Sequence, residues 1–259
     1  MNVNILAVGD VCGETGLGFA IKTLPGFKKM KNISFCVVNA ENTVQSLSGT
    51  IPHHCEELLQ AGADVLTLGN HTWDRRELWN FLDDCPYILR PSNYAPQTPG
   101  RGWGIFDSPF GDVCVMNLIG RCEMSFGTEN PFFEADKILR GCDCKIKLVD
   151  FHAEATSEKL SMAFHIDGRA SALWGTHTHV QTADAEVFPA GLGYITDLGM
   201  TGARRGIIGI TPSVALSRFL GDPPERIEDA GGAAKLEGAI FEIDPKTGKC
   251  VGVEPVRLT

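Results

Sequence analysis

The sequence predicts an α/β fold in which a sandwich of β-sheets is covered by helices. Short apolar runs of strand length alternate with segments of helical length along most of the chain. No linker, internal repeat or low-complexity block divides the 259 residues, and α/β chains of this size occur as one unit. We therefore expect a single domain over residues 1–259.

The first half of the chain begins this alternation. The predicted strands are residues 4–8, 33–38 and 64–68, and the predicted helices are residues 14–24, 50–60 and 74–83. Pro25 is expected to end the first helix, because proline removes a main-chain donor and crowds the preceding turn. Thr50 is a candidate N-cap of the second helix, and Asp74 with Glu77 resembles a capping box for the third.

The second half continues in the same way and ends differently. The predicted strands are residues 113–119, 146–149 and 173–174, and the predicted helices are residues 131–139 and 155–164. Residues 191–226 are rich in glycine and proline, which predicts an excursion of loop and helix. Residues 238–243 and 250–258 flank a turn-forming segment and predict a C-terminal β-hairpin.

Charge and composition exclude several classes of partner. The chain carries 23 Lys and Arg against 32 Asp and Glu, a formal charge of −9, which argues against binding of long nucleic acid. A small anionic substrate remains compatible with this charge, because a bound metal can reverse the field at one site. No apolar stretch approaches the roughly 18 residues of a membrane span, so no membrane partner is expected.

The cysteines and the N-terminus indicate the compartment. The first apolar run is short and Asp10 interrupts it, so it is typical of a strand and not of a secretory signal. The odd count of nine cysteines then predicts a cytoplasmic protein with reduced thiols. A homo-oligomer stays open, since an exposed apolar surface cannot be identified from the sequence.

Polar residues with metal-binding atoms directly follow the predicted strands. They are Asp10, Glu41, Asn42, Asn70, His71, His152, His177 and His179. Because open α/β sheets bind ligands at the carboxyl ends of their strands, we expect these side chains to lie along one rim. Carboxylate, amide and imidazole groups together suit a pair of divalent transition metals. His177 and His179 lie two apart on a segment expected to be extended, which would put both rings on one face.

Each of these residues also has a more ordinary explanation. Asp10 alone would serve as a turn residue or helix cap, and Asn42 and Asn70 alone would be turn formers. His152 alone would be a half-buried structural imidazole. The metal hypothesis rests on the recurrence of such residues at successive strand ends.

Short blocks around these residues resemble those of the calcineurin-like metallophosphoesterases. The blocks are Gly9-Asp10, Gly69-Asn70-His71 and Gly175-Thr176-His177-Thr178-His179. A closer resemblance is to the bacterial YmdB-type subgroup, on the blocks at residues 9–13, 39–42, 69–74, 90–94, 150–154, 175–184 and 196–202. With the C-terminal hairpin, which also fits, the resemblance covers nearly the whole chain.

Two residues depart from the pattern of the wider superfamily. Cys12 takes the place of a histidine ligand in the first block, and Glu41 takes the place of the usual bridging aspartate. Both departures are shared with the YmdB-type subgroup. They suggest that Asn42 compensates at the first metal.

The resemblance implies a four-layer αββα sandwich with a site for two metals at the carboxyl ends of strands. One metal would be held by Asp10, Glu41, Asn42 and His179, and the other by Glu41, Asn70, His152 and His177. Glu41 would bridge the two. The divalent metals implied are iron first and manganese second, with zinc or magnesium as alternatives.

The resemblance further implies hydrolysis of small phosphodiesters, above all 2′,3′-cyclic nucleotides, by a hydroxide that bridges the metals. His71 is the expected acid for the leaving group, with a structural or phosphate-contacting imidazole as the alternative. Two other functions stay open: a broad-specificity phosphatase or nuclease, and a metal-binding regulator with vestigial catalysis. The residues that bind the substrate base cannot be assigned. The candidates by motif or side-chain type are Arg90, Asn93, Tyr94, Arg121 and Phe132, each with loop structure as its alternative role.

Overall fold

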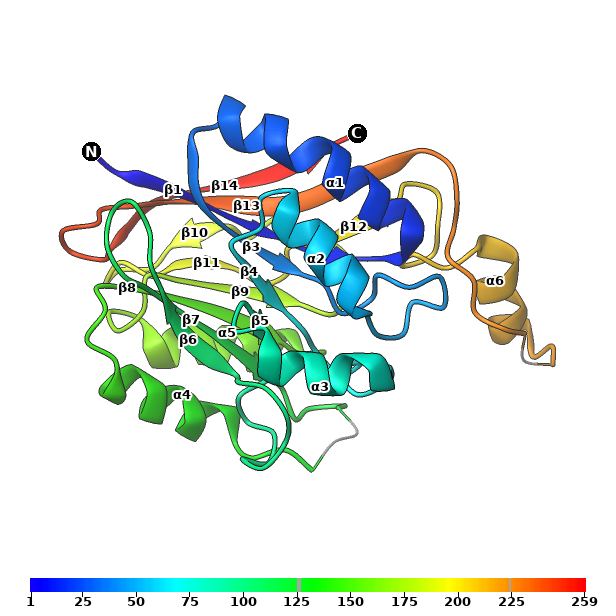
Figure 1. Ribbon diagram of the computed structural model, residues 1–259, viewed down its shortest axis with the longest axis horizontal. Helices are drawn as coiled ribbons and strands as arrows, with labels where there is room; N and C mark the ends of the chain where they lie inside the picture. Colours follow the sequence, from blue (N-terminus) through cyan, green and yellow to red (C-terminus); the bar gives the residue numbers. More distant parts are fainter. Residues whose placement is uncertain (125–126, 224) are drawn as a thin grey trace.

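A computed structural model describes residues 1–124, 127–223 and 225–259. Two β-sheets pack face to face and helices cover the outer face of each, which gives four layers in the order helix, sheet, sheet, helix (Figure 1). The predicted sandwich is therefore confirmed. None of the described helices is long and apolar enough to cross a membrane.

The first sheet contains both ends of the chain. Its strand order is β2-β12-β13-β1-β3-β4-β5, and β14 also pairs with β13. The bounds are β1 Val3–Val8, β2 Asp10–Val11, β3 Ile33–Asn39, β4 Val65–Thr67, β5 Ile88–Leu89, β12 Met200–Ala203, β13 Ala234–Ile243 and β14 Cys250–Leu258. β1, β3, β4 and β5 run parallel, so their carboxyl ends open at the same edge. β13 and β14 form the predicted hairpin.

The second sheet is ordered β10-β11-β9-β8-β7-β6. The bounds are β6 Trp103–Phe106, β7 Val113–Ile119, β8 Ile146–His152, β9 Ala172–Thr176, β10 Glu186–Val187 and β11 Gly193–Ile195. β7, β8, β9 and β11 run parallel. The parallel strands of this sheet therefore also end at a common edge.

Helices lie on the outer faces. α1 (Gly13–Met30), α2 (Pro52–Gln60) and α3 (Arg76–Asp84) pack on the first sheet. α4 (Pro131–Gly141) and α5 (Thr156–Ile166) pack on the second. α6 (Pro212–Leu220) lies apart from both layers, at one end of the molecule (Figure 1).

The alternation of side chains along β1 explains how one strand serves two layers. Ile5 and Ala7 point into the core between the two sheets, whereas Leu6 and Val8 point toward the helices. Both faces of the strand are buried, and a parallel strand covered on both sides reads as a continuous apolar run. The apolar run at residues 4–8 therefore predicted the strand β1 correctly.

The predicted end of the first helix is wrong. α1 continues through Pro25 to Met30. A proline inside a helix costs about 3 kcal/mol. Leu24 and Phe27 are buried on either side of it, and burying a large apolar side chain contributes about 1.5–3 kcal/mol. Packing on the sheet therefore offsets the local preference.

Two predicted caps are also wrong. α2 begins at Pro52, one residue after Ile51, and the hydroxyl of Thr50 instead bonds that of Thr43 at 2.6 Å. α3 begins at Arg76 without a side-chain cap, because Asp74 has other partners. The segment 191–226 contains the predicted helix, α6, but also β11 and β12, whose glycines concealed their strand character.

Candidate metal centre

The candidate site lies where parallel strands of both sheets end. In the first sheet, β1, β3 and β4 lead into Asp10, Glu41 and Asn70. In the second sheet, β8 ends at His152, and β9 ends one residue before His177. The expected rim of polar side chains therefore exists, and both sheets contribute to it.

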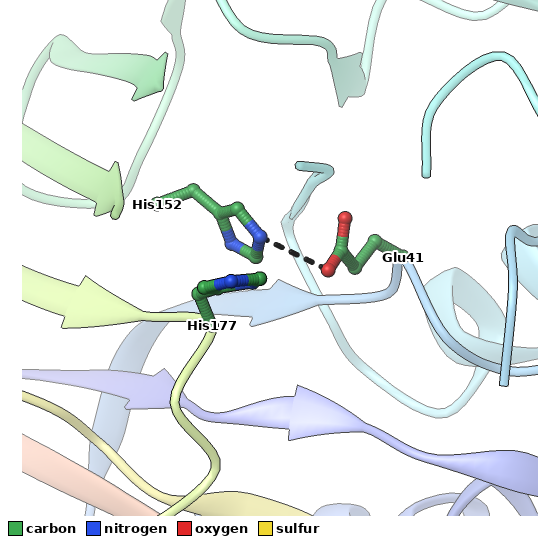
Figure 2. A group of neighbouring side chains, drawn as sticks. All are labelled: Glu41, His152 and His177. Carbon is green, nitrogen blue, oxygen red and sulfur yellow. Dashed lines mark ion pairs between the residues drawn. The ribbon is translucent and has the colours of Figure 1, made fainter. Parts of the chain in front are cut away.

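Glu41, His152 and His177 form a compact group (Figure 2). One ligand atom from each residue lies within 4.8 Å of the others. Nε2 of His152 is 3.0 Å from Oε1 of Glu41, and the two imidazole rings are 4.8 Å apart between centroids. Burial lowers the pKa of His177 to about 4. Its ring is therefore neutral at neutral pH, as a metal ligand must be.

A second group adjoins the first and shares Glu41 with it. Oδ1 of Asp10 and Nδ2 of Asn42 lie 3.7 Å and 3.4 Å from Nε2 of His179. Nδ2 of Asn42 also donates to Oε1 of Glu41 at 3.1 Å. Glu41 thus lies between the two groups, in the place that a bridging carboxylate would take.

Hydrogen bonds around His152 define the position of its proton. Burial raises the pKa of Asp150 to about 6, and the hydroxyls of Thr67 and Thr176 both donate to this carboxylate. Oγ1 of Thr176 donates its single proton to Asp150 at 2.7 Å. The same hydroxyl therefore accepts from Nδ1–H of His152 at 2.9 Å. In the neutral ring, Nε2 of His152 then carries a lone pair.

Several atoms that can bind a metal converge on the site. Although burial opposes it, the carboxylate of Glu41 raises the pKa of His152, so Nε2 can hold a proton that a bound metal would displace. Nε2 of His152 lies 2.9 Å from Oδ1 of Asn70 and 3.0 Å from Oε1 of Glu41, and both oxygens are acceptors. Oδ1 of Asp10 and Oδ1 of Asn42 are buried and lack a hydrogen-bond partner within the described chain. An unsatisfied buried acceptor costs about 1–3 kcal/mol. A divalent cation would satisfy such oxygen and nitrogen atoms together, so the donor set fits a metal.

His177 and His179 lie on a turn, so the prediction of an extended segment is wrong. Their φ angles are 98° and 63°, in the left-handed region that residues other than glycine rarely adopt. His177 N donates to Oδ2 of Asp10 at 3.2 Å. Thr178, between the two histidines, donates its N and Oγ1 to Oδ2 of Asp197 at 3.2 Å and 2.7 Å. Two buried carboxylates thus hold the turn that carries both rings to the site.

Gly69 lets the loop after β4 pass close to these side chains. A Cβ on Gly69 would lie 2.3 Å from both Oε2 of Glu41 and Nε2 of His152. The loop then continues into Asn70 and His71, and His71 N donates to Oε2 of Glu41 at 3.1 Å. Only glycine permits this approach.

His71 lies beside the two groups and has its own partners. Nδ1 of His71 is 2.8 Å from Oδ2 of Asp74, and Oγ of Ser48 donates to the same carboxylate oxygen. The sequence did not identify Asp74 and Ser48 as partners of His71, because an acidic residue three positions before Glu77 is typical of a capping box. The spacing of three residues between His71 and Asp74 was the available signal.

Glu154 was also missed. Its Oε2 lies 3.2 Å from Nε2 of His177. Carboxylates that bond the ring of a metal-binding histidine orient that ring. Glu154 closes the block 150–154 after β8, so an acidic residue at a strand end was the signal.

A cavity of about 380 Å³ opens beside the two groups. The polar and charged residues in its lining are Glu41, Asn42, Ser48, His71, Glu154, His177, Thr178 and His179. None of the five candidates for base recognition belongs to its described lining. Arg90 instead donates to the carbonyl of Pro91, and Asn93 donates to the carbonyls of Ile119 and Glu129. Both side chains support loops.

Comparisons with known proteins agree with this architecture. The family model for YmdB-like proteins matches residues 6–256. The 2′,3′-cyclic-nucleotide 2′-phosphodiesterase of Bacillus subtilis is 40% identical over 260 residues, which cover 99% of this chain and 97% of that protein.

Two crystal structures share the fold. A hypothetical protein of Thermus thermophilus superposes with a TM-score of 0.92 at 35% identity, and the match covers 99% of each chain. A protein of Mycoplasma pneumoniae described as a novel phosphatase superposes with a TM-score of 0.93 at 33% identity. That match covers 100% of this chain and 94% of the other.

Proposed function

The chain belongs to the YmdB-like family, and from this membership we propose that it hydrolyses 2′,3′-cyclic nucleotides with the aid of two divalent metals. Its relatives are named as a phosphodiesterase and as phosphatases or phosphodiesterases, so the chain is a phosphoesterase. The substrate is a small phosphodiester, and we take residues 1–259 to act as one domain. The free state of all nine cysteines supports a reducing, cytoplasmic compartment.

The convergence of acceptor atoms is the observation that carries the metal part of the proposal. Nε2 of His152, Oε1 of Glu41 and Oδ1 of Asn70 face one another, an arrangement that a divalent cation would satisfy. We assign one metal to Asp10, Glu41, Asn42 and His179, and the other to Glu41, Asn70, His152 and His177. Iron is the first candidate and manganese the second, because imidazole and carboxylate ligands suit both.

The side chains of the site have different roles in hydrolysis. When bound, two divalent cations would supply Lewis acidity that lowers the pKa of water and offsets charge on the phosphoryl oxygens. His71 supplies the proton for the leaving sugar oxygen. Its Nδ1–H donates to Asp74, so the proton that it transfers is held on Nε2. Asp74 and Ser48 keep this ring at the cavity.

A comparison of three substrates tests the proposal. Protein purified without oxygen and analysed for metal would be assayed with 2′,3′-cyclic AMP, 3′,5′-cyclic AMP and p-nitrophenyl phosphate. We expect the highest kcat/KM for 2′,3′-cyclic AMP. A preference for p-nitrophenyl phosphate would instead support a phosphatase, in line with the Mycoplasma relative. Full metal content without any hydrolysis would support a regulatory protein.

A further inference from the structure

The cavity at the site has a second, apolar wall that the proposed chemistry does not use. Four aliphatic side chains form it: Leu47, Ile208, Ile210 and Ile227. They come from two segments far apart in the sequence, the loop after β3 and the residues on either side of α6. The same cavity is lined by the proposed phosphoesterase groups, so one ligand can touch both.

Ile208 joins the two walls. Its carbonyl accepts a hydrogen bond from Nδ1–H of His179 at 2.9 Å, while its side chain lines the cavity. Its φ is 46°, which is unfavourable for a β-branched residue. The side chain is also 50% exposed. Neither the positive φ nor the exposure of Ile208 stabilises the fold. Packing within the protein therefore does not explain why an isoleucine stands at this position.

The other wall residues pack differently. Leu47 is buried in a small cluster with Cys12 and Met200, and Ile210 and Ile227 pack against that cluster. These three residues form a packed apolar surface, and the exposed side chain of Ile208 extends that surface toward the solvent. The wall therefore presents an aliphatic surface that is ready for a planar apolar ligand group.

The two hydroxyl side chains that line the cavity already have partners. The hydroxyls of Ser48 and Thr178 donate to Asp74 and Asp197. The wall itself has no donor or acceptor in its side chains. A ligand ring placed on this wall would gain burial without specific hydrogen bonds.

We propose that this wall, Leu47, Ile208, Ile210 and Ile227, receives the base of the cyclic nucleotide and accepts all four bases. The inference rests on the proposed function, because the nucleotide is what places a ring beside the phosphate. An aliphatic contact binds a ring through its area, and it cannot distinguish the hydrogen-bonding edges of different bases.

Two substrates separate the contribution of the base from that of the phosphate. One is 2′,3′-cyclic AMP, and the other is methyl riboside 2,3-cyclic phosphate, which has no base. Ile208→Ala should raise KM for 2′,3′-cyclic AMP by about tenfold, the effect of losing methylene contacts in an apolar pocket. Its KM for the base-free substrate and its metal content should stay unchanged. Ile207→Ala is the matched control, since Ile207 is 39% exposed but is not among the described residues that line the cavity.

A second variant controls for a change in backbone conformation at position 208. Ile208→Asn suits the left-handed conformation and removes the aliphatic surface, so it should raise KM for 2′,3′-cyclic AMP in the same way. An equal loss for both substrates, or no change for either, would overturn the inference. Failure of the wild-type protein to hydrolyse even the base-free substrate would instead refute the proposed function.

The preference among the four bases is an independent test of the inference. The wild-type kcat/KM values for the 2′,3′-cyclic phosphates of adenosine, guanosine, cytidine and uridine should lie within about 10²-fold of one another. Sites that hydrogen-bond a ligand group reject analogues without it by about 10⁴-fold or more. Discrimination of that size would overturn the inference.

Discussion

Oδ2 of Asp74 lies 2.8 Å from Nδ1 of His71, three residues earlier in the chain. Ser48 donates to the same carboxylate oxygen, and Nε of Arg75 holds the Ser48 carbonyl at 3.0 Å. Two loops, one after β3 and one before α3, therefore fix the imidazole of His71 beside the cavity. Asp74 is a positioning residue, since it acts through that ring.

The His71–Asp74 pair gives the first prediction. His71→Ala should keep its metal and lose about 10²–10⁴-fold in kcat, the usual contribution of a general acid. Asp74→Asn should lose less, about 10–100-fold, the range for a group that supports a functional residue. Its metal content should stay unchanged, because Asp74 acts through the ring of His71 and not on the proposed ligands.

Glu77→Gln is the control for this pair, because Glu77 is exposed in the same segment. It should leave both kcat and metal content unchanged. Loss of metal in His71→Ala would place His71 among the metal ligands and refute its role as the acid.

Gly69 gives the second prediction. Gly69→Ala should lower metal affinity and turnover together, by about 10–100-fold, because the added Cβ would displace Glu41 and His152. Gly26→Ala is the matched control, since a Cβ there meets nothing within 4 Å. That change lies inside α1 and should stabilise the protein by up to about 1 kcal/mol. Elemental analysis and urea unfolding measure both effects, and full metal content in Gly69→Ala would contradict the account.

A buried ion pair beneath the histidine turn gives the third prediction. Nζ of Lys159 lies 2.7 Å from Oδ2 of Asp197, and both side chains are fully buried. Asp197 is the residue that binds Thr178. Lys159→Met should destabilise the protein by about 3–5 kcal/mol at pH 7.5, because it leaves the carboxylate uncompensated.

The pH dependence of this loss has a definite sign. Burial raises the pKa of Asp197 above its usual value, and removal of Lys159 can only raise it further. The folded variant then binds a proton that the unfolded chain releases, so its stability rises as the pH falls from neutral toward 4. Urea unfolding should show the gap to wild type narrowing on acidification. A gap that is constant or widens would argue against an uncompensated carboxylate, and Lys159→Met/Asp197→Leu should recover part of the loss at pH 7.5.

The parts of this molecule that sequence could predict are those set by local patterns. Asp10, Asn70 and His152 follow apolar strands, and parallel strands bring their carboxyl ends to one edge. The sequence could not reveal that Asp74 turns back to His71, because a short acidic residue before a helix usually caps it. Nor could it reveal the extension of α1 past Pro25, which depends on packing against the sheet.

Two features of the site depend on contacts between distant segments. The backbone of His177 and His179 is held in an unusual conformation by carboxylates at positions 10 and 197. Ile208 reaches the cavity from a segment that the composition marked only as loop and helix. The spacing of neighbouring residues in the sequence does not reveal contacts between segments that lie far apart in it.

Glu41 gives the fourth prediction. Glu41→Gln removes the carboxylate that lies between the two groups of proposed metal ligands, so turnover of 2′,3′-cyclic AMP should fall by at least about 10²–10³-fold, as when one stabilising group is removed. Glu154→Gln is a milder comparison at the edge of the same site, since it retains a hydrogen-bonding group beside His177. Full activity with full metal content in Glu41→Gln would rule out the bridging role.

The most direct test of the two-metal proposal is a titration of metal back into chelated protein under anaerobic conditions. Turnover of 2′,3′-cyclic AMP would be measured against iron or manganese bound per chain. We expect no turnover without metal and a maximum at two ions per chain, as the shared position of Glu41 implies. Full turnover by metal-free protein, or a maximum at one ion per chain, would contradict the two-metal proposal.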